Sequence, residues 1–583
     1  MTKIIKNMGR IEWTYFALSV ILVICQVYFD LKVPDYMANI TILVKTPGSP
    51  LSDIWLSGIK MLLCAITAML ITFLSDLVTS KLAATFSLNL RAKVFGKINQ
   101  FSLEEIDNFS VSSLITRSTN DIATIQRFVA GGLNQLVKAP ITVAIALTKI
   151  SGKHWQWSTL TCVCVFVIIC VIGYVVKYAH PRFRKMQVLT DELNKATREN
   201  LTGIRVVKAY NASKYQEDKF AKANNNLTDN AMQAHHAMAI MQPTMKFLNN
   251  GLTIGIYLTG AYIISTLGYN DALVTFSEMV VFSTYASKIL QAFMSLNMVF
   301  NQMPRAGVCA ERVNEVLEQP LSILDGDKEE GTEKGTIEFR DVSFTYPGAS
   351  SPALNKISFS GKKGETIAFI GATGSGKTTL VNLVMRFYDT SSGEILIDGI
   401  NVKDYKLKSL RSKIGYAPQR AILMTGSVES NIAYGDSRNG ERDQEAIRKA
   451  IEIAQAKDFV ENMPDSYQGA IARGGANVSG GQKQRLSIAR AIYRQPEFYI
   501  FDDAFSALDY KTDRALRNAL KEETSGVTTL IVAQRIGTIR DADKIIVLDE
   551  GGIVGMGTHN ELMSSCKTYQ EIAYTQLSKE ELA

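Results

Sequence analysis

The chain has 583 residues, of which 46% are hydrophobic, and a formal net charge of +7 at pH 7. This length excludes a single-domain protein. The positive charge does not indicate nucleic acid binding, because the basic residues gather in segments predicted to face the cytoplasm and no zinc-finger spacing accompanies them. The seven cysteines are scattered without metal spacing, which favours free thiols over a disulfide framework.

Six long apolar blocks occupy the first half of the chain. A helix that crosses a bilayer needs about 20 mostly apolar residues, and each block is long enough. Lysine and arginine concentrate before the first block and between the fourth and fifth, which predicts a multi-pass protein of the cell membrane with both chain ends in the cytoplasm. The predicted spans are 12–32, 54–79, 130–151, 156–178, 244–267 and 275–303.

Two connections on the cytoplasmic side, 80–129 and 179–243, are too long for turns and lack the composition of linkers. Their mixed polar and apolar pattern predicts that the spans continue as helices into the cytoplasm, each pair joined by a short crossing helix. We place these crossing helices near Asn108–Arg117 and Ile204–Ala212.

Four ionisable residues lie within or near the apolar blocks: Asp76, Lys246, Glu278 and Lys288. Such residues either pair between helices and reach the membrane interface, or form a polar patch in a substrate cavity. The sequence leaves both interpretations open.

After the sixth block the composition changes. Residues 1–313 form the predicted transmembrane domain, 314–334 a polar and acidic linker, and 335–583 a soluble domain in which short β-rich runs alternate with helical stretches. The predicted fold is therefore an all-α membrane domain of six transmembrane helices with long cytoplasmic extensions, followed by an α/β P-loop nucleotide-binding domain.

The most informative motif of the soluble domain is a glycine-rich turn between the apolar run 366–370 and a predicted helix. It has the G-x-x-x-x-G-K-[ST] spacing of a phosphate-binding loop, in which backbone N–H groups, a lysine and a hydroxyl hold a nucleoside triphosphate. The predicted ATP-binding residues of this loop are Gly371, Thr373, Gly374, Ser375, Gly376, Lys377, Thr378 and Thr379.

Further motifs surround this loop in the sequence. Tyr346 is an aromatic residue that can stack on a purine. Gln419 follows a predicted strand, and Asp502 ends a buried one, so that Thr378, Gln419 and Asp502 are candidate ligands of Mg²⁺. A serine and two glycines, in the segment Ser479, Gly480, Gly481 and Gln482, precede a helix predicted over Lys483–Tyr493 and can bind an anion. A turn ending at Asp509 follows Asp502.

In this order, after six spans, these motifs resemble an ATP-binding cassette (ABC) exporter of the multidrug half-transporter type. The segment Val478–Gln482 resembles the signature of that family, with valine in place of the usual leucine. The resemblance implies a dimer in which each ATP lies between the phosphate loop of one chain and the signature of the other, with Asp509 in the D-loop. It also implies that the two crossing helices couple the domains.

Two positions depart from the family pattern. The residue after Asp502 is Asp503, where the family has glutamate, and Gln534 stands where the family has its switch histidine. A shorter carboxylate is withdrawn by about 1.5 Å, and glutamine cannot hold an imidazole's place in a proton network. We interpret the site on this chain's own loop as degenerate, although neutral drift that leaves Asp503 a working base is the alternative.

Together these features predict an ATPase-coupled translocase that exports amphipathic or drug-like compounds. The intact signature predicts that this chain completes a hydrolytic site on a second half-transporter, which carries the glutamate and histidine missing here. The alternatives are a homodimeric exporter with weakened catalysis and an ATP-gated regulatory or channel-like membrane protein.

Overall fold

The computed structural model describes residues 8–46, 48–435, 443–523 and 525–576. The chain forms two compact units. The first, the membrane unit, holds Met1–Asn99 and Ser112–Gln319, and the second, the nucleotide unit, holds Gln100–Val111 and Pro320–Ala583. The short segment 100–111 therefore belongs to the nucleotide unit although its neighbours in sequence belong to the membrane unit.

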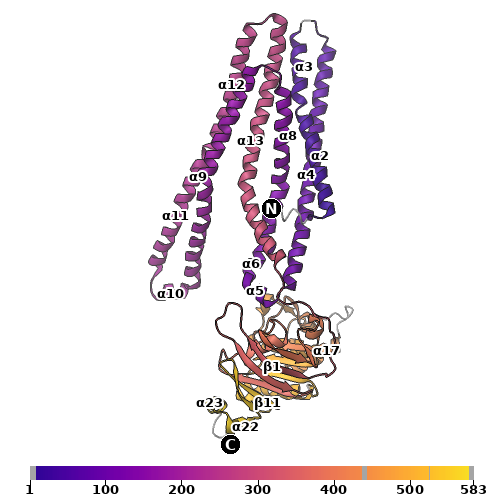
Figure 1. Ribbon diagram of the computed structural model, residues 1–583, viewed down its shortest axis with the longest axis vertical. Helices are drawn as coiled ribbons and strands as arrows, with labels where there is room; N and C mark the ends of the chain where they lie inside the picture. Colours follow the sequence, from indigo (N-terminus) through magenta and orange to yellow (C-terminus); the bar gives the residue numbers. More distant parts are fainter. Residues whose placement is uncertain (1–7, 47, 436–442, 524, 577–583) are drawn as a thin grey trace. The chain divides into compact units, whose positions relative to one another are not determined.

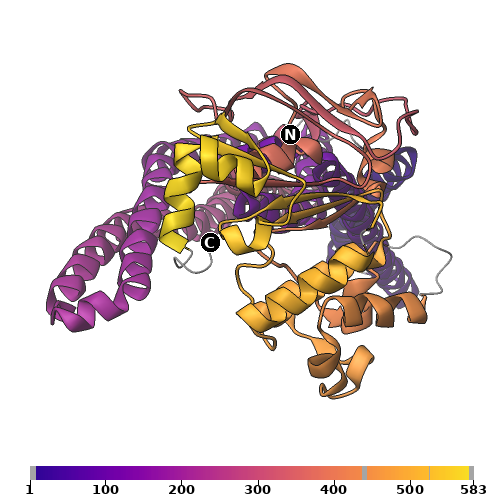
Figure 2. The same cartoon turned by 90° about the horizontal axis from the view of Figure 1, so that it is seen from below.

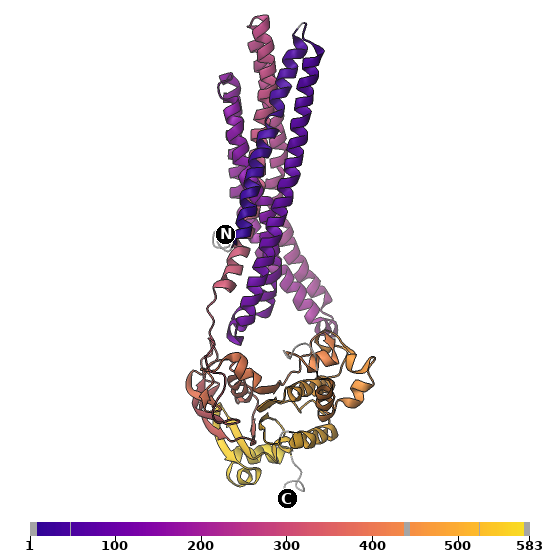
Figure 3. The same cartoon turned by 90° about the vertical axis from the view of Figure 1, so that its right-hand side faces the viewer.

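The described part of the membrane unit contains six helical stretches long and apolar enough to cross a membrane, which confirms the predicted fold class. Figures 1 and 3 show these helices running alongside one another. Several exceed the thickness of a bilayer, since a helix of 50 residues such as α4 is about 75 Å long. The stretches are Arg10–Lys45, Leu51–Gln100, Val111–Ile150, Trp155–Thr202, Ser213–Ser265 and Asp271–Leu296.

Short interruptions divide some of these stretches into separate helices. Two π-helical turns, Arg117–Asp121 and Phe128–Gly132, divide the third stretch, and the helix that contains the sixth begins at Tyr269 and ends at Glu318. The helices are α2 (Arg10–Asp30), α3 (Val33–Lys45), α4 (Leu51–Gln100), α6 (Val111–Thr116), α7 (Ile122–Arg127), α8 (Leu133–Ile150), α9 (Trp155–Thr202), α10 (Ile204–Ala209), α11 (Ser213–Ala239), α12 (Met241–Ser265) and α13 (Tyr269–Glu318).

The core of the membrane unit lies along α13. Phe282 and Tyr285 of α13 are fully buried, and the Phe282 ring lies 5.4 Å from the ring of Trp157 on α9. Lipid tails are as apolar as leucine, so the close packing of such side chains, together with hydrogen bonds between helices, holds a membrane bundle together.

Short helices lie at or near both positions where the sequence predicts crossing helices. The second, α10, covers Ile204–Ala209, within the predicted 204–212. The first was predicted at 108–117, whereas the structure has a separate short helix, α5, at Leu103–Phe109. This helix begins earlier because Ser102 and Glu105 form a capping box, and Ser110 ends it with a positive φ of 61°.

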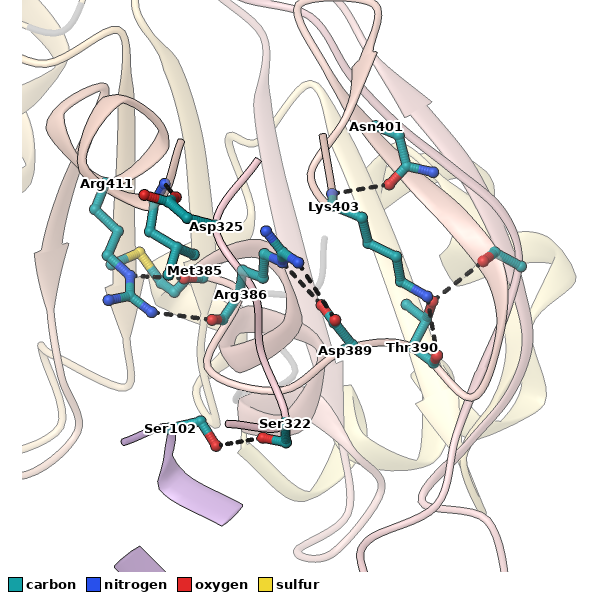
Figure 4. Close-up of polar contacts among 12 residues, drawn as sticks. Ser102, Ser322, Asp325, Met385, Arg386, Asp389, Thr390, Asn401, Lys403 and Arg411 are labelled. Carbon is teal, nitrogen blue, oxygen red and sulfur yellow. Dashed lines mark hydrogen bonds and ion pairs between the residues drawn. The ribbon is translucent and has the colours of Figure 1, made fainter. Parts of the chain in front are cut away.

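The predicted linker 314–334 also has fixed contacts. Its first residues continue α13 to Glu318, and Ser322 then bonds to the Ser102 hydroxyl (Figure 4). The acidic part runs along residues 404–406, where the Gly326 N–H donates to the Tyr405 carbonyl and the Asp325 carboxylate accepts from the Leu407 N–H. Its backbone is paired there, as polar groups close to a domain surface require.

The nucleotide unit is built on a six-stranded sheet, mostly parallel, and a four-stranded antiparallel sheet. The strand order of the first is β12-β11-β3-β10-β9-β6, and that of the second is β2-β1-β4-β5. The strands are β1 (Ile337–Phe344), β2 (Leu354–Gly361), β3 (Thr366–Gly371), β4 (Ser392–Ile397), β5 (Ile400–Asn401), β6 (Ile414–Ala417), β9 (Phe498–Asp502), β10 (Thr528–Val532), β11 (Lys544–Asp549) and β12 (Gly552–Gly557), with β7 (Gly426–Ser427) and β8 (Ala470–Ile471) forming a small ribbon.

Both faces of the six-stranded sheet are covered. Alternate residues of β3 belong to different cores: Ile367 and Phe369 pack toward the antiparallel sheet, whereas Ala368 and Ile370 pack toward the C-terminal helices, drawn in yellow in Figure 2. The helices of this unit are α14 (Lys377–Val384), α15 (Leu407–Ser412), α16 (Val428–Ile432), α17 (Gln444–Ile453), α18 (Lys457–Glu461), α19 (Gly480–Tyr493), α20 (Tyr510–Glu523), α21 (Ile536–Ile539), α22 (His559–Ser565) and α23 (Lys567–Gln576). The carboxyl ends of β3 and β9 meet at one edge, which is where the phosphate loop and Asp502 lie.

Candidate nucleotide site

A cavity of about 350 Å³ in the nucleotide unit gathers most of the residues that the sequence singled out. Gly371 and Ser375 do not line the cavity, but the Gly371 carbonyl and the Ser375 hydroxyl accept hydrogen bonds from the Lys377 ammonium. Ala353 and Val532, which the sequence analysis did not select, complete the wall. The predicted residues that line the cavity are Tyr346, Thr373, Gly374, Gly376, Lys377, Thr378, Thr379, Gln419, Asp502, Asp503 and Gln534.

The phosphate loop has the geometry that its glycines predict. Gly376 caps α14 with a φ of +96°, and a Cβ atom there would lie 2.6 Å from a methyl carbon of Leu354. The Lys377 ammonium donates to the carbonyls of Gly371, at 2.9 Å, and Ala372, at 2.7 Å. Burial lowers the pKa of this ammonium, while the carboxylates of Asp503 and Asp502 oppose that shift. A buried cation at a helix N-terminus is suited to bind phosphate oxygens.

Thr378 and Asp502 place two oxygens side by side. The Thr378 hydroxyl donates to Oδ1 of Asp502 over 3.1 Å, and Asp502 is buried at the end of β9. Burial raises the pKa of Asp502 to about 6. Hydroxyl and carboxylate oxygens are ligands that Mg²⁺ accepts, so this pair fits a magnesium ion bound together with triphosphate.

The two residues that depart from the family pattern contact each other. The Gln534 side-chain amide donates to Oδ2 of Asp503 over 3.0 Å, and the Gln419 amide approaches the same oxygen at 3.4 Å. The carboxylate can only accept, so both glutamines present their nitrogen to it. Burial raises the pKa of Asp503, whose backbone adopts a positive φ of 49°. Asp503 is thus held between two amides at the edge of the cavity.

Tyr346, which we expect to stack on the purine, packs against Tyr388, a residue that the sequence analysis did not select. The Tyr346 hydroxyl lies 3.0 Å from that of Thr379, and its ring packs edge-on against Tyr388. The Tyr388 hydroxyl donates to Asp107 of α5 over 2.9 Å. Only a contact between positions far apart in sequence connects these side chains, so no local motif could have predicted it.

The loop that carries Gln534 is held by the last described helix. Gln576 of α23 donates from its side chain to the Gln534 carbonyl, at 2.7 Å, and accepts from the Ile536 N–H, at 2.9 Å. This pair of hydrogen bonds fixes the backbone on both sides of Arg535. No sequence motif indicates this role for Gln576.

The signature segment does not line the cavity. Ser479 caps α19, which begins at Gly480, three residues before the predicted start, because the Ser479 and Gln482 side chains form a capping box. The serine and Gly480 are exposed. Asp509 likewise caps the next helix, accepting from Thr512. Within one chain the structure keeps the signature apart from the phosphate loop.

Comparisons with known proteins identify the family. The ABC transporter transmembrane region family matches residues 16–294, and the ABC transporter family matches residues 354–506. An uncharacterized ABC transporter ATP-binding protein of Mycobacterium tuberculosis is 37% identical over 500 residues, which are 85% of each chain. The chain belongs to the ABC transporter family.

Two further similarities concern a flippase and an exporter. An ATP-dependent lipid A-core flippase of Pseudomonas aeruginosa is 32% identical over 505 residues, 86% of this chain and 82% of that protein. The solved structure of a bacterial Atm1-family ABC exporter with ATP bound has the same fold, with a TM-score of 0.80 at 23% identity over 97% of this chain and 99% of that one. The predictions of an ABC exporter, a multi-pass membrane protein and an ATP-binding domain are confirmed. Exporters of this family act as dimers in the bilayer.

Proposed function

We propose that this ABC exporter is one subunit of a heterodimer, and that the ATP site on its own phosphate loop holds nucleotide but hydrolyses it poorly. The observation that carries the proposal is the hydrogen bond between Gln534 and Asp503 in the nucleotide cavity. Two substitutions that contact each other at one site are more easily explained as a matched change of the site than as independent drift.

The chemistry of this pair supports weak hydrolysis. A general base must reach the attacking water, and a misplacement of about 1 Å can reduce the rate on the order of a hundredfold. Asp503 is one methylene shorter than glutamate, and two amides occupy one of its oxygens. The Gln534 amide donates a hydrogen bond, but unlike histidine it cannot take up and release a proton near neutral pH. The site keeps its phosphate contacts and loses its base.

Binding of ATP needs none of the altered residues. We assign the phosphates to Lys377 and the loop amides, and the purine ring to Tyr346. Thr378, Asp502 and Gln419 would hold Mg²⁺, which neutralises phosphate charge when it is bound. This set of residues supports a site that retains ATP and keeps the dimer closed.

The exposed signature supports the second half of the proposal. The N-terminus of α19 offers an anion-binding surface made of the Ser479 side chain and the amides of Gly480 and Gly481. These residues do not line the nucleotide cavity of their own chain. We assign this surface, with Gln482 and Asp509 beside it, to the ATP on the partner subunit's phosphate loop. The partner then supplies the catalytic glutamate and histidine.

The transport cycle follows from these two sites. ATP binding closes the dimer and shifts the membrane unit toward its outward state, and hydrolysis at the partner's site resets it. We place both chain ends and the nucleotide unit in the cytoplasm, as the distribution of basic residues indicates. An amphipathic substrate is supported by the similarity to a lipid A-core flippase.

The first test is purification of the chain alone and with candidate partner half-transporters. We expect robust, vanadate-sensitive ATPase activity only from the mixed complex. Equal activity per site from the chain alone would support a homodimer and contradict the proposal. Transport should be vectorial in inverted vesicles, and purely downhill flux would indicate an ATP-gated channel.

A paired substitution tests the degenerate site itself. Asp503→Glu together with Gln534→His should restore turnover at this chain's own site, raising the ATPase rate of the complex by up to about twofold if both sites then cycle. Because the two residues are hydrogen-bonded, each single substitution should restore less than half of that gain. Additive effects of the single variants would show that the contact does not matter.

A further inference from the structure

Two adjacent cavities lie within the membrane unit. The first, of about 140 Å³, lies between α2, α8 and α13, and the second, of about 320 Å³, lies between α2, α3, α4 and α13. Asp30 and Lys288 line both cavities, and Lys138 lines the first. The remaining polar residues around them are Gln135, Thr142, Gln291 and Ser295 in the first, and Thr72 and Thr284 in the second.

Two lysines at the ends of the membrane helices form ion pairs. Lys149 contacts Asp35 at 2.6 Å, and Tyr285 donates to the same carboxylate. Lys153 contacts Glu278 at 3.0 Å. Glu278 of α13 is therefore paired with a lysine of the turn between α8 and α9, which favours ion pairing over a polar patch in a substrate cavity.

The charges around the cavities are arranged differently. Within the described part of the chain, the side chains of Asp30, Lys138 and Lys288 have neither an ion-pair nor a hydrogen-bond partner, although each is half-buried. Two ammonium groups and one carboxylate leave the cavities with a net charge of +1. Unneutralised charge at this place is unfavourable unless a ligand or water compensates it.

Lys288 lies inside α13, and Lys138 lies inside the helical stretch Val111–Ile150, rather than at the ends of these segments. Lys288 lies about 28 Å from the Tyr269 end of α13, and Lys138 about 18 Å from the Ile150 end of α8, at 1.5 Å per residue. Lysine side chains near a helix end reach the interface, but these lie far along their helices from those ends.

We propose that Lys138 and Lys288 bind the singly charged anionic headgroup of an exported lipid-like amphiphile. A monoanion, such as a phosphodiester, balances the net charge that Asp30 leaves, and the two ammonium groups can donate charge-assisted hydrogen bonds to its oxygens. The inference rests on the proposed export function and names its substrate class.

The surroundings of the second cavity fit the apolar part of such a molecule. Ala65, Ala68 and Met69 of α4 form part of its wall. Their neighbours Leu62, Ile66 and Phe73 are exposed in the single chain and extend the apolar surface along the same helix. The two cavities have the size of a headgroup and the first part of its chains, so the remaining acyl chain would lie along α4.

The test uses the full-length chain with its copurifying partner in proteoliposomes. Fluorescent phosphatidylglycerol and phosphatidylcholine with identical acyl chains differ only in headgroup charge, and ATP-dependent movement of each is followed by dithionite quenching. We expect phosphatidylglycerol to move about tenfold faster, as expected for one charged hydrogen bond. Lys288→Gln and Lys138→Gln should each remove most of this preference.

Lys246→Gln is the matched control, because Lys246 is an exposed membrane-unit lysine of α12 that lines neither cavity. Its preference should equal that of the unmodified protein. An unchanged preference in Lys288→Gln, an equal loss in Lys246→Gln, or competition by soluble glycerophosphoglycerol as strong as that by the lipid would overturn the inference. If the complex transported an amphipathic dye but showed no preference for phosphatidylglycerol, only the headgroup inference would be overturned. If it transported no amphiphile, the proposed export function would be refuted.

Discussion

The phosphate-loop cavity and the signature end of the nucleotide unit differ in how far each keeps the family pattern. The cavity keeps the residues expected to bind phosphate, whereas Asp503 and Gln534, which depart from the family pattern, are hydrogen-bonded to each other. At the signature, Ser479 and Gln482 form a complete capping box on an exposed helix N-terminus. The proposed function therefore assigns ATP binding and the contribution to hydrolysis to two different parts of one domain.

The largest expected effect comes from changing the signature without changing its fold. Aspartate caps a helix as well as serine does, so Ser479→Asp should preserve α19 but place a carboxylate against the partner's ATP. We expect the ATPase rate of the complex to fall on the order of a hundredfold, since this reverses an electrostatic contact in the site.

Ser479→Asn is the control for this substitution, because asparagine is an equally good cap without charge. It should retain most of the ATPase activity, and both variants should keep the melting temperature of the unmodified protein. If Ser479→Asp retained full activity, the signature would not contribute to the hydrolytic site and the comparison would fail.

A smaller effect is expected from removing the hydrogen bond between Tyr388, which packs against Tyr346, and Asp107. Tyr388→Phe keeps the ring that supports Tyr346 but removes the hydrogen bond to Asp107 of α5. Loss of a bond to a charged group corresponds to about 1.5–3 kcal/mol. We expect ATP affinity to change less than twofold, while substrate stimulation of the ATPase falls about tenfold. A loss of ATP affinity with normal stimulation would instead make Tyr388 part of the nucleotide site alone.

The smallest effect concerns acid stability of the C-terminal helices that hold the Gln534 loop. Nδ1 of His559, in α22, lies 2.8 Å from the Tyr569 hydroxyl of α23, and burial, assisted by Arg540, lowers the pKa of His559, while Asp541 opposes the shift. Because the unfolded histidine binds a proton more readily, stability should fall as pH falls below about 6.5.

Differential scanning fluorimetry of the complex between about pH 7.5 and pH 5.5 checks this expectation. The melting temperature of the nucleotide unit should fall more in the unmodified protein than in His559→Gln, whose amide does not titrate. An identical fall in both would assign the acid sensitivity to other groups.

Local patterns were sufficient to predict much of the fold. The six spans followed from apolar length, and the phosphate loop followed from the spacing of its glycines and Lys377, because both signals lie within short segments. The start of α5, about five residues before the predicted first crossing helix, depends on the cap at Ser102, and its position depends on the contact between Asp107 and Tyr388. That contact joins residues far apart in the chain.

The same distinction applies to the sites. Asp503 and Gln534 stood out one at a time in the sequence, but their hydrogen bond required β9 and β10 to be neighbours. In the membrane unit, Glu278 and Lys288 carried the same sequence signal, and only the packing of helices distinguished a paired charge from one that lines a cavity.

The central claim is that this chain's own site keeps ATP while the partner's site hydrolyses it. The most direct test traps the complex with vanadate in the presence of photoreactive radiolabelled ATP, crosslinks the nucleotide, and separates the two chains by mass. We predict ATP on the chain that carries Lys377 and ADP on its partner. Equal amounts of ADP on both chains, unchanged by Asp503→Asn, would contradict the account.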